Sequence, residues 1–414
     1  MLEKIPNLRH LRAFSEVARS HSISTAAERI FLSQSAVTQA IGKLEARLGI
    51  SLFVRRHNGM YLTDSGELLV HRVDRCMAFL RTGTREAVRI ADRKQDGVRA
   101  SVHPSDQMTN AHLRALLALQ TATSYSTAAR SLGISQPAVY RAAGELEGLL
   151  NAVLFEKTSI GISLTRAALR LARFALLGLR ELEQGLFEVQ EMQGADSTLI
   201  RVGSMPLART FLLPAAINRI STLKPEIRVD VLEGPYDDLL NRLLHGELDL
   251  LIGALRDPAP SSDIQQEQLL TSPISVVARK QHPLAGGGTL TLDDLRGYPW
   301  VVPREGTPAR SLFNRLIAAQ DPSALRGVIE CSSQIVIREL LLGSDRLTFI
   351  SSHQIEHEQQ EGILTVLNID MPPVERPIGI TTRKDWQPTT TQRLFISIVR
   401  SLAQSLAQTT RLVR

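Results

Sequence analysis

The chain has 414 residues, of which 43% are hydrophobic and 22% charged, and its net charge is +6. This length predicts two to four domains, and this composition excludes a disordered chain. No run approaches the ~18 apolar residues of a membrane span and the first ten residues are too charged for a signal peptide, so we expect a cytoplasmic protein. Cys76 and Cys331 have no metal-like spacing, which favours two reduced thiols.

The excess positive charge lies in the first quarter of the chain. Residues 1–99 contain 17 Lys and Arg against 10 Asp and Glu, whereas residues 198–414 contain 23 of each sign. Residues 100–197 contain 8 against 9. Because phosphate attracts cationic surfaces irrespective of base sequence, we expect a nucleic acid to contact the first quarter.

Two segments match each other without a gap at an offset of 102 residues. The matches are Leu11-Arg12-Ala13 with Leu113-Arg114-Ala115, Ser24 to Ala27 with Ser126 to Ala129, Ser33-Gln34 with Ser135-Gln136, Leu44-Glu45 with Leu146-Glu147, and Leu62-Thr63 with Leu164-Thr165. So many aligned identities over some fifty positions predict a duplicated domain.

Each copy predicts three helices, and the first copy shows the pattern best. Residues 8–20 have one apolar face, and Ser24 and Thr25 are expected to cap a short second helix. Ser33 is expected to cap a third helix that ends near Gly49. Its outward residues are polar and are suited to hydrogen bonding with base edges in a major groove. These residues are Ser33, Gln34, Ser35, Thr38 and Gln39.

A hairpin follows the third helix. Residues 52–54 and 61–63 are expected to form two short strands, with Arg55 and Arg56 placed for contact with phosphate. A long helix is expected over about residues 64–94. The run AAERIFLSQSAVTQAIGKLEARLGISLFVRR, followed by LTDSG, resembles the DNA-binding signature of LysR-type regulators. The resemblance implies a winged helix-turn-helix whose third helix reads the major groove and whose long helix pairs two protomers.

The second copy resembles the same motif with less positive charge. Its candidate DNA-binding residues are Gln136, Tyr140, Arg141 and Lys157, and fewer phosphate contacts predict weaker binding. It is either a second reader of DNA or a decayed copy kept for dimerisation and spacing. Residues 165–193 form an apolar helix whose Leu and Phe spacing suits a partner helix, and residues 95–109 are expected to link the copies.

From Ser197 strands alternate with helices, which predicts parallel sheet units with a ligand cleft near Ser204. RVGSMP, LLPAAINRI, GELDLLIG and VVARKQHPLA resemble the LysR-type effector domain, which implies two α/β lobes like those of periplasmic binding proteins. The residues that this resemblance places at the effector site are Ser204, Met205, Ser272, Pro303, Arg304 and Thr307. His353 and His357 lack a third metal ligand, so we expect a surface pair and no metal site.

The expected fold is multidomain, with α and α/β parts: two tandem winged helix-turn-helix domains followed by a two-lobed, periplasmic-binding-protein-like α/β effector domain. The expected domains are 1–97, 98–195 and 196–390, with a C-terminal helix or tail at 391–414.

The expected function is sequence-specific DNA binding and transcription regulation controlled by a small molecule of unknown identity. No catalytic motif is present, so we expect neither an enzyme nor a cofactor. Expected partners are double-stranded DNA, the effector, further copies of the chain as a dimer or tetramer, and RNA polymerase, with no membrane. The alternative is a small-molecule-binding module with a helical protein-interaction region and no affinity for DNA.

Overall fold

The computed structural model describes residues 5–91, 103–159, 161–319, 322–325 and 327–412. It divides into two compact units, the first ending at Thr198 and including His245–Glu247, and the second comprising the rest from Leu199. Among the described residues, none of the helices is both long and apolar enough to span a membrane.

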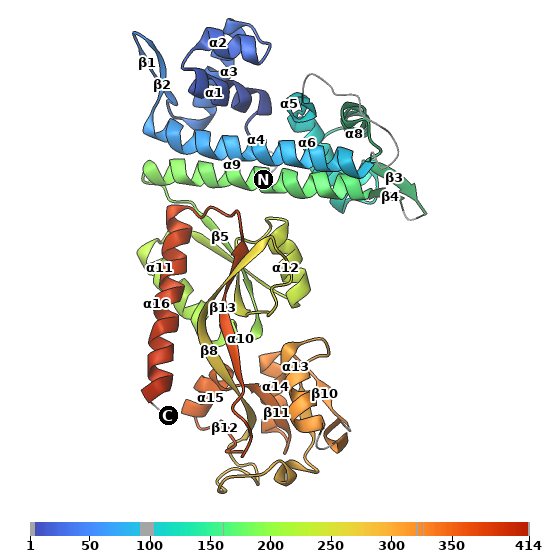
Figure 1. The fold of residues 1–414 in the computed structure, drawn as a ribbon, viewed down its shortest axis with the longest axis vertical. Helices are drawn as coiled ribbons and strands as arrows, with labels where there is room; N and C mark the ends of the chain where they lie inside the picture. The colour runs from blue at the N-terminus through green and yellow to red at the C-terminus, as the bar shows by residue number, and fades with distance from the viewer. Residues whose placement is uncertain (1–4, 92–102, 160, 320–321, 326, 413–414) are drawn as a thin grey trace. The chain divides into compact units, whose positions relative to one another are not determined.

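The first unit contains the same order of elements twice: three helices, a two-stranded hairpin and a long helix (Figure 1). The first set comprises α1 (Leu8–Ser20), α2 (Ile23–Arg29), α3 (Gln34–Leu48), β1 (Phe53–Arg56), β2 (Gly59–Leu62) and α4 (Asp64–Ala91). The second set comprises α6 (Asn110–Thr121), α7 (Tyr125–Leu132), α8 (Gln136–Leu150), β3 (Phe155–Thr158), β4 (Gly161–Leu164) and α9 (Arg166–Met192).

Local capping explains where the helices of the first set begin and end. Ser33 Oγ accepts a hydrogen bond of 3.2 Å from the backbone N–H of Ala36, and Gly49 ends α3 in the left-handed region. The expectation for α2 was wrong by two residues, because the cap is Ser22, whose Oγ accepts from the N–H of Thr25. Ser24 is therefore an exposed residue inside the helix.

The hydrogen bonds that hold each hairpin also recur 102 residues apart. Glu45 Oε1 accepts from the N–H of Leu52 at 2.7 Å, and Glu147 Oε1 accepts from the N–H of Leu154 at 2.7 Å. A Cβ at Gly59 would lie 2.5 Å from the carbonyl oxygen of His21, so a side chain would block the close approach of hairpin and helix.

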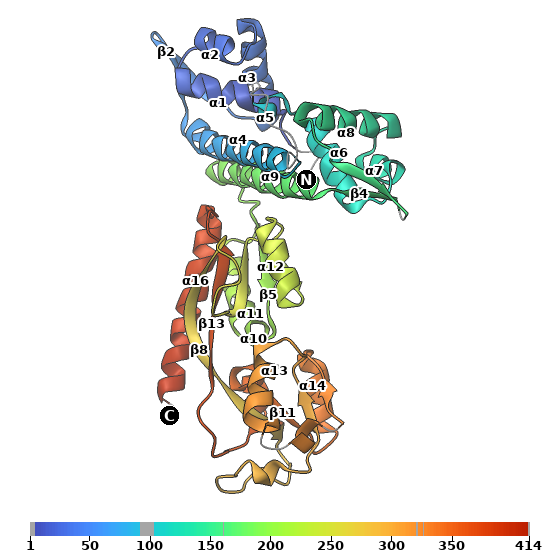
Figure 2. The same ribbon diagram turned by 45° about the vertical axis from the view of Figure 1, so that its right-hand side comes forward.

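The two long helices lie side by side in antiparallel directions (Figures 1 and 2). Small residues allow the approach: a Cβ at Gly83 of α4 would lie 2.7 Å from Phe174 of α9, and one at Gly178 would lie 3.2 Å from Cys76. The apolar spacing of residues 165–193 correctly predicted a partner helix, and that partner is α4 of the same chain.

The segment expected to link the copies is partly folded. Residues 92–102 lie outside the described residues, but α5 (Pro104–Gln107) follows them and packs on the first copy. The guanidinium of Arg12 donates to the carbonyl oxygens of Ser105 at 2.7 Å and Met108 at 2.8 Å. Ser105 and Met108 are buried, so this part of the expected linker is anchored to the first copy by two residues.

The second unit contains one sheet of nine strands in the order β10-β9-β11-β8-β13-β7-β5-β6, with β12 paired to β8. The strands are β5 (Leu199–Ser204), β6 (Arg228–Glu233), β7 (Leu250–Ala254), β8 (Ile264–Arg279), β9 (Trp300–Val302), β10 (Ile329–Glu330), β11 (Leu347–Ser351), β12 (Leu364–Val366) and β13 (Glu375–Arg383). β5 is parallel to β6 and β7, and β9 is parallel to β10 and β11, as the alternation of strands and helices predicted.

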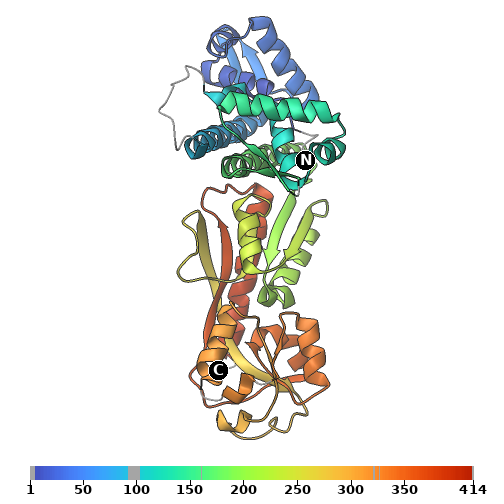
Figure 3. The same ribbon diagram turned by 90° about the vertical axis from the view of Figure 1, so that its right-hand side faces the viewer.

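The long strands β8 and β13 join two lobes of this unit and run antiparallel to each other (Figures 2 and 3). The register shifts after Ile378, where Gly379 lies so close to Glu267 that a Cβ would meet its carbonyl oxygen at 1.9 Å. The first lobe has β5–β7 and the second has β9–β12.

Helices cover the sheet in both lobes. Those of the first lobe are α10 (Pro206–Thr210), α11 (Leu212–Leu223), α12 (Tyr236–Leu244) and α16 (Thr390–Leu412). Those of the second are η2 (Asp293–Leu295), α13 (Pro308–Phe313), η3 (Asn314–Ala318), η4 (Pro322–Leu325), α14 (Gln334–Leu342), η5 (Ser352–Ile355) and α15 (Glu356–Gln360). Residues 391–414, which the sequence set apart, belong largely to α16, and Phe395 and Val399 are part of the first lobe's core.

Candidate functional site

The predicted groove-reading residues of the first copy lie at the start of α3, and their side chains are exposed. Gln34, Ser35, Thr38 and Gln39 face solvent, while Val37, Ala40, Ile41 and Leu44 of the same helix are buried. Ser33 is also exposed, but its hydroxyl is engaged by the N–H of Ala36 and by Ser35 Oγ at 3.0 Å. Ser33 therefore caps the helix, and Gln34, Ser35, Thr38 and Gln39 form the accessible polar edge.

The hairpin of the first copy carries two exposed cations. Arg55 and Arg56 are exposed on β1, and the guanidinium of Arg56 lies 5.0 Å from the ring centre of Tyr61 on β2. The ring of His21 stacks on the same tyrosine at 5.1 Å, so Tyr61 contacts both a guanidinium and an imidazole. The shape of the hairpin follows from the Gly59 turn and from Glu45 at its base.

Sequence reasoning missed two further cations on α3. Lys43 and Arg47 are exposed, and they follow Gln39 at intervals of four residues, which places all three on one face of the helix. That spacing was a readable signal. The face therefore continues from hydrogen-bonding side chains at the start of α3 to cations near its end.

The second copy has the same arrangement of elements as the first, but different side chains are exposed on it. Gln136, Tyr140 and Arg141 are exposed on α8, and Lys157 is exposed on β3. Tyr140 contacts Tyr125 edge-to-face at 5.2 Å. Glu145 and Leu149 stand where the first copy has Lys43 and Arg47, so α8 lacks the cations that α3 carries.

The predicted effector residues near the end of β5 are buried. Ser204 is fully buried, and Arg209 Nη2 donates to its carbonyl oxygen at 3.2 Å. Met205 is 8% exposed and packs on Gly253, where a Cβ would lie 2.6 Å away. Both side chains therefore lie in the interior of the first lobe.

Ser272 lies in the middle of β8, where the strand passes between the lobes. Its hydroxyl contacts Ser351 Oγ at the end of β11 and lies 2.7 Å from His353 Nδ1. Arg376 of β13 is its partner in the antiparallel register. Ser272 was predicted, whereas Ser351, His353 and Arg376 were missed, because strand pairing brings them together from positions 79 to 104 residues away in sequence.

Two guanidinium groups approach each other beside this cluster. Burial and the neighbouring Arg256 lower the pKa of Arg376 to about 10, and Arg256 lies 4.5 Å from the ring centre of Tyr236. Among the described residues, no ion pair joins a carboxylate to either guanidinium. Two cations without a bound acid can accept an anion.

The three predicted residues on the second lobe lie around the start of α13. Thr307 caps the helix, since its Oγ accepts from the N–H of Arg310 at 3.3 Å. The carbonyl oxygen of Pro303 accepts from Arg310 Nη1 at 3.2 Å, and Arg304 is exposed. Within the described residues, the hydroxyl of Ser272 has Ser351 and His353 as its hydrogen-bond partners and none of these three residues.

The expected surface pair His353 and His357 was half wrong. His357 is exposed, but His353 is half-buried beside Ser272, and burial lowers its pKa. Within the described ranges no group of three or more His, Cys, Asp and Glu side chains has the geometry of a metal site.

Known families match both halves of the chain. The model described as "Bacterial regulatory helix-turn-helix protein, lysR family" matches residues 8–67 and 111–169, and the model "LysR substrate binding domain" matches residues 193–404. A similar curated protein is the HTH-type transcriptional regulator GalR of Pseudomonas putida, with 38% identity covering 92% of this chain and 93% of that one. The regulator PcaQ of Agrobacterium fabrum is 28% identical over 71% of this chain and 95% of its own.

Solved structures share the fold at low sequence identity. A single-residue variant of full-length OxyR from Pseudomonas aeruginosa has a TM-score of 0.51 at 19% identity, covering 70% of this chain and 97% of that chain. Full-length CbnR complexed with its target DNA has a TM-score of 0.50 at 20% identity, covering 70% and 98%. Both comparisons leave nearly a third of this chain unmatched, so the chain is longer than these structures by about the size of one helical copy.

Proposed function

The chain belongs to the LysR family of DNA-binding transcription regulators with an effector-binding domain, and from this premise we propose which of its residues read DNA and hold the effector. α3 of the first copy enters the major groove with Gln34, Ser35, Thr38 and Gln39 toward the base edges. The observation that carries this proposal is that these side chains are exposed together at the start of a capped helix whose other face is buried.

Arg55 and Arg56 of the hairpin contact the phosphate backbone, and Lys43 and Arg47 add to the same electrostatic field. Such contacts hold the protein on any duplex and carry no base preference, whereas the amide of Gln34 distinguishes one base from another. Affinity and sequence preference therefore depend on different residues of the first copy.

The second copy is a second winged helix-turn-helix that also reads DNA. Its hairpin is held by Glu147 as the first is held by Glu45, and Gln136, Tyr140 and Arg141 are exposed at the start of α8. Lys157 is the single predicted phosphate contact in its hairpin. The second copy therefore contributes base contacts with less electrostatic affinity than the first.

The effector is a small anion held between two lobes arranged like those of periplasmic binding proteins. Arg376 and Arg256 supply positive charge, while Ser272, Ser351 and His353 supply hydrogen bonds. Binding across β8 and β13 changes the lobe arrangement, and the regulator works as a homo-oligomer that contacts RNA polymerase. No metal or organic cofactor takes part.

The test is binding of full-length protein to duplex DNA over a range of salt concentrations. The double variant Arg55→Ala and Arg56→Ala is expected to weaken binding to all sequences and to flatten the salt slope by about 0.9 for each lost phosphate contact. Arg219→Ala removes an exposed cation from α11, in the second unit, and is the control. If wild-type protein binds no duplex at low salt, the alternative of a protein-interaction module replaces this proposal.

A further inference from the structure

Equivalent residues of the two copies touch each other at two places. Leu8 and Asn110 are equivalent at the offset of 102, and the N–H of Leu8 donates to Asn110 Oδ1 over 2.9 Å. Cys76 and Gly178 are also equivalent, and a Cβ at Gly178 would lie 3.2 Å from Cys76 Sγ. In a symmetric pair, contact between a residue and its own equivalent occurs at the two-fold axis. These two contacts therefore mark an internal pseudo-two-fold axis.

Contacts away from the axis are reciprocal, as such an axis requires. Gly83 of α4 faces Phe174 and Leu171 of α9, at 2.7 and 3.2 Å from an added Cβ. Its equivalent, Gly185 of α9, faces Arg72 and Leu69 of α4 at 2.9 and 3.4 Å. Residues 72 and 174, and residues 69 and 171, are equivalents, so each copy offers the same patch to the other. The two copies are thus paired as subunits of a symmetric dimer would be, but within one chain.

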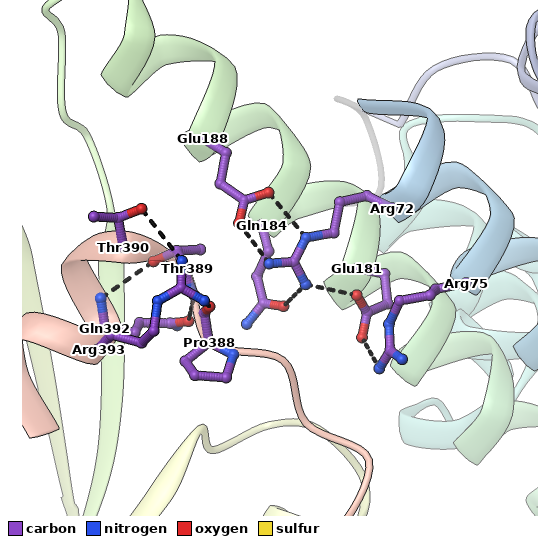
Figure 4. A network of polar contacts seen from close by, with 10 residues as sticks. All are labelled: Arg72, Arg75, Glu181, Gln184, Glu188, Pro388, Thr389, Thr390, Gln392 and Arg393. Carbon is purple, nitrogen blue, oxygen red and sulfur yellow. Dashed lines mark hydrogen bonds and ion pairs between the residues drawn. The ribbon is translucent and has the colours of Figure 1, made fainter. Parts of the chain in front are cut away.

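The backbone arrangement of α4 and α9 is symmetric, but the side chains at equivalent positions differ. Arg72 is 4% exposed, and its guanidinium donates to Glu181 at 2.8 Å and Glu188 at 2.6 Å (Figure 4). On the other side of the axis, the equivalents of Arg72 and Glu181 are Phe174 and Phe79, whose ring centres are 6.4 Å apart. Each side has an ion pair at an equivalent carboxylate, Glu188 with Arg72 and Glu86 with Arg170. The two sides differ because Glu181 meets Arg72 on one side, whereas Phe79 meets Phe174 on the other.

This asymmetry selects the unlike pair of helices over two like ones. In a pair of two α4 helices, Phe79 would stand at the position of Glu181, and each Arg72 would keep one carboxylate, Glu86, which is the equivalent of Glu188. Two α9 helices would bury Glu181 against Phe174 with no guanidinium to neutralise it. An unpaired buried charge is strongly unfavourable, so α4 pairs with α9.

We propose that the pairing of α4 with α9 brings the two DNA-reading helices of one chain, α3 and α8, together as a pair. This pair recognises two unlike half-sites in inverted orientation on one duplex. The inference rests on the proposed function of both copies. Because pseudo-two-fold symmetry in a protein matches pseudo-two-fold symmetry in its site, α3 and α8 meet the duplex in opposite orientations. Their exposed residues differ at Thr38 against Tyr140 and Gln39 against Arg141, so the two half-sites differ in sequence.

The experiment is selection of tight-binding duplexes from a random pool by the full chain, wild type and two variants. The wild type is expected to enrich an inverted pair of unlike half-sites. Gln34→Ala is expected to lower preference for the correct bases by about ten-fold in one half-site alone, and Gln136→Ala in the other alone. A symmetric site in which Gln34→Ala affects both halves would overturn the inference, as would a single half-site insensitive to Gln136→Ala.

Stoichiometry provides an independent measurement on the same sites. With protein and duplex both well above the dissociation constant, one chain is expected to saturate one duplex that carries one pair of half-sites. Saturation at two chains per duplex would contradict an intrachain pair of readers. Binding of wild-type protein to random duplex at low salt is measured beside it. If that binding is absent, the proposed function has failed, and if it persists while the selected site is symmetric, the intrachain pair alone has failed.

Discussion

Arg72 of α4 and Glu181 of α9 form an ion pair of 2.8 Å although their side chains are only 4% and 6% exposed. Arg75 joins Glu181 from the other side at 2.8 Å, and Gln184 accepts from Arg72 at 3.1 Å, so the charges are enclosed by hydrogen bonds (Figure 4). Removing one partner of such a buried pair leaves an uncompensated charge, which is strongly unfavourable.

The first prediction follows from that penalty. Arg72→Met is expected to lower the free energy of unfolding of the helical unit by about 3–5 kcal/mol, because Glu188 loses its guanidinium partner and Glu181 keeps only Arg75. Urea denaturation followed by circular dichroism measures the loss. Arg89→Met on the same helix is the control, since Arg89 is 74% exposed in its pair with Glu86 and such pairs contribute about 1 kcal/mol or less. Equal losses for the two variants would contradict a structural role for Arg72.

The second prediction concerns the closest approach of the long helices. Gly83→Ala would bring a Cβ to 2.7 Å from the Cβ of Phe174, which cannot rotate away, so we expect a destabilisation of about 1–3 kcal/mol. Gly144→Ala on α8 is the matched control, because nothing lies within 4 Å of its Cβ position and alanine favours a helix over glycine by about 1 kcal/mol. The melting temperature should fall for the first variant and should not fall for the second.

The third prediction concerns Glu45, which accepts the N–H groups of Leu52 at 2.7 Å and Phe53 at 3.3 Å at the base of the first hairpin. Glu45→Ala leaves these donors without their acceptor and is expected to cost about 1–3 kcal/mol and to weaken DNA binding. Glu45→Gln keeps an oxygen that can accept both bonds and is expected to restore most of the affinity. Failure of Glu45→Gln to recover any binding in a titration with duplex DNA would show that the charge, rather than hairpin geometry, matters.

Much of the first unit could be predicted because its signals are local. The cap at Ser33, the stop at Gly49 and the repeat at an offset of 102 can be found in neighbouring residues or in a plain comparison of two segments. The start of α2 was misplaced because Ser22, Ser24 and Thr25 are all capable caps, and only the folded backbone decides which hydroxyl reaches an N–H.

The residues of the proposed effector site could be predicted only in part. Ser272 was found through resemblance, whereas Arg376 and His353 reach it through the register of β8 with β13 and through the turn after β11. The pairing of strands that are distant in sequence produces no periodic pattern of residues, so it cannot be predicted from a single sequence. The partner of α9 was hidden for a similar reason, because an apolar helix face shows that a partner exists without showing that it is α4 of the same chain.

The fourth prediction concerns the different reactivity of the two cysteines toward an alkylating reagent. Burial raises the pKa of the Cys76 thiol, so little thiolate forms near neutral pH, and its contact with α9 shields it from reagents. Cys331 is half-buried in the second unit. Iodoacetamide at about pH 8, close to the ordinary pKa of a thiol, is expected to label Cys331 in folded protein and Cys76 only after denaturation, as measured by mass spectrometry of peptides. Rapid labelling of Cys76 in the folded state would mean that α4 and α9 separate readily.

The fifth prediction is a pH dependence centred on His353. Burial lowers the pKa of His353, and Glu356 offsets part of that shift, so the folded protein holds the ring neutral below the ordinary pKa of about 6.5. As the pH falls below that value, the unfolded chain binds a proton that the folded chain does not, and the second unit loses stability until the folded pKa is reached. Above about pH 7 the contribution is fully present. His282 acts in the same direction, because burial lowers its pKa too.

His353→Gln should therefore flatten the fall in stability between about pH 7 and pH 5 without abolishing it. Trp300 and Trp386, the two tryptophans of the chain, both lie in the second unit, so urea unfolding followed by tryptophan fluorescence reports on that unit alone. His357→Gln removes an exposed imidazole four residues away and is the control. An identical pH dependence in wild type and His353→Gln would show that the imidazole beside Ser272 titrates equally in both states, and the proposed role of a neutral His353 as a hydrogen-bonding partner of the effector would then have to be abandoned.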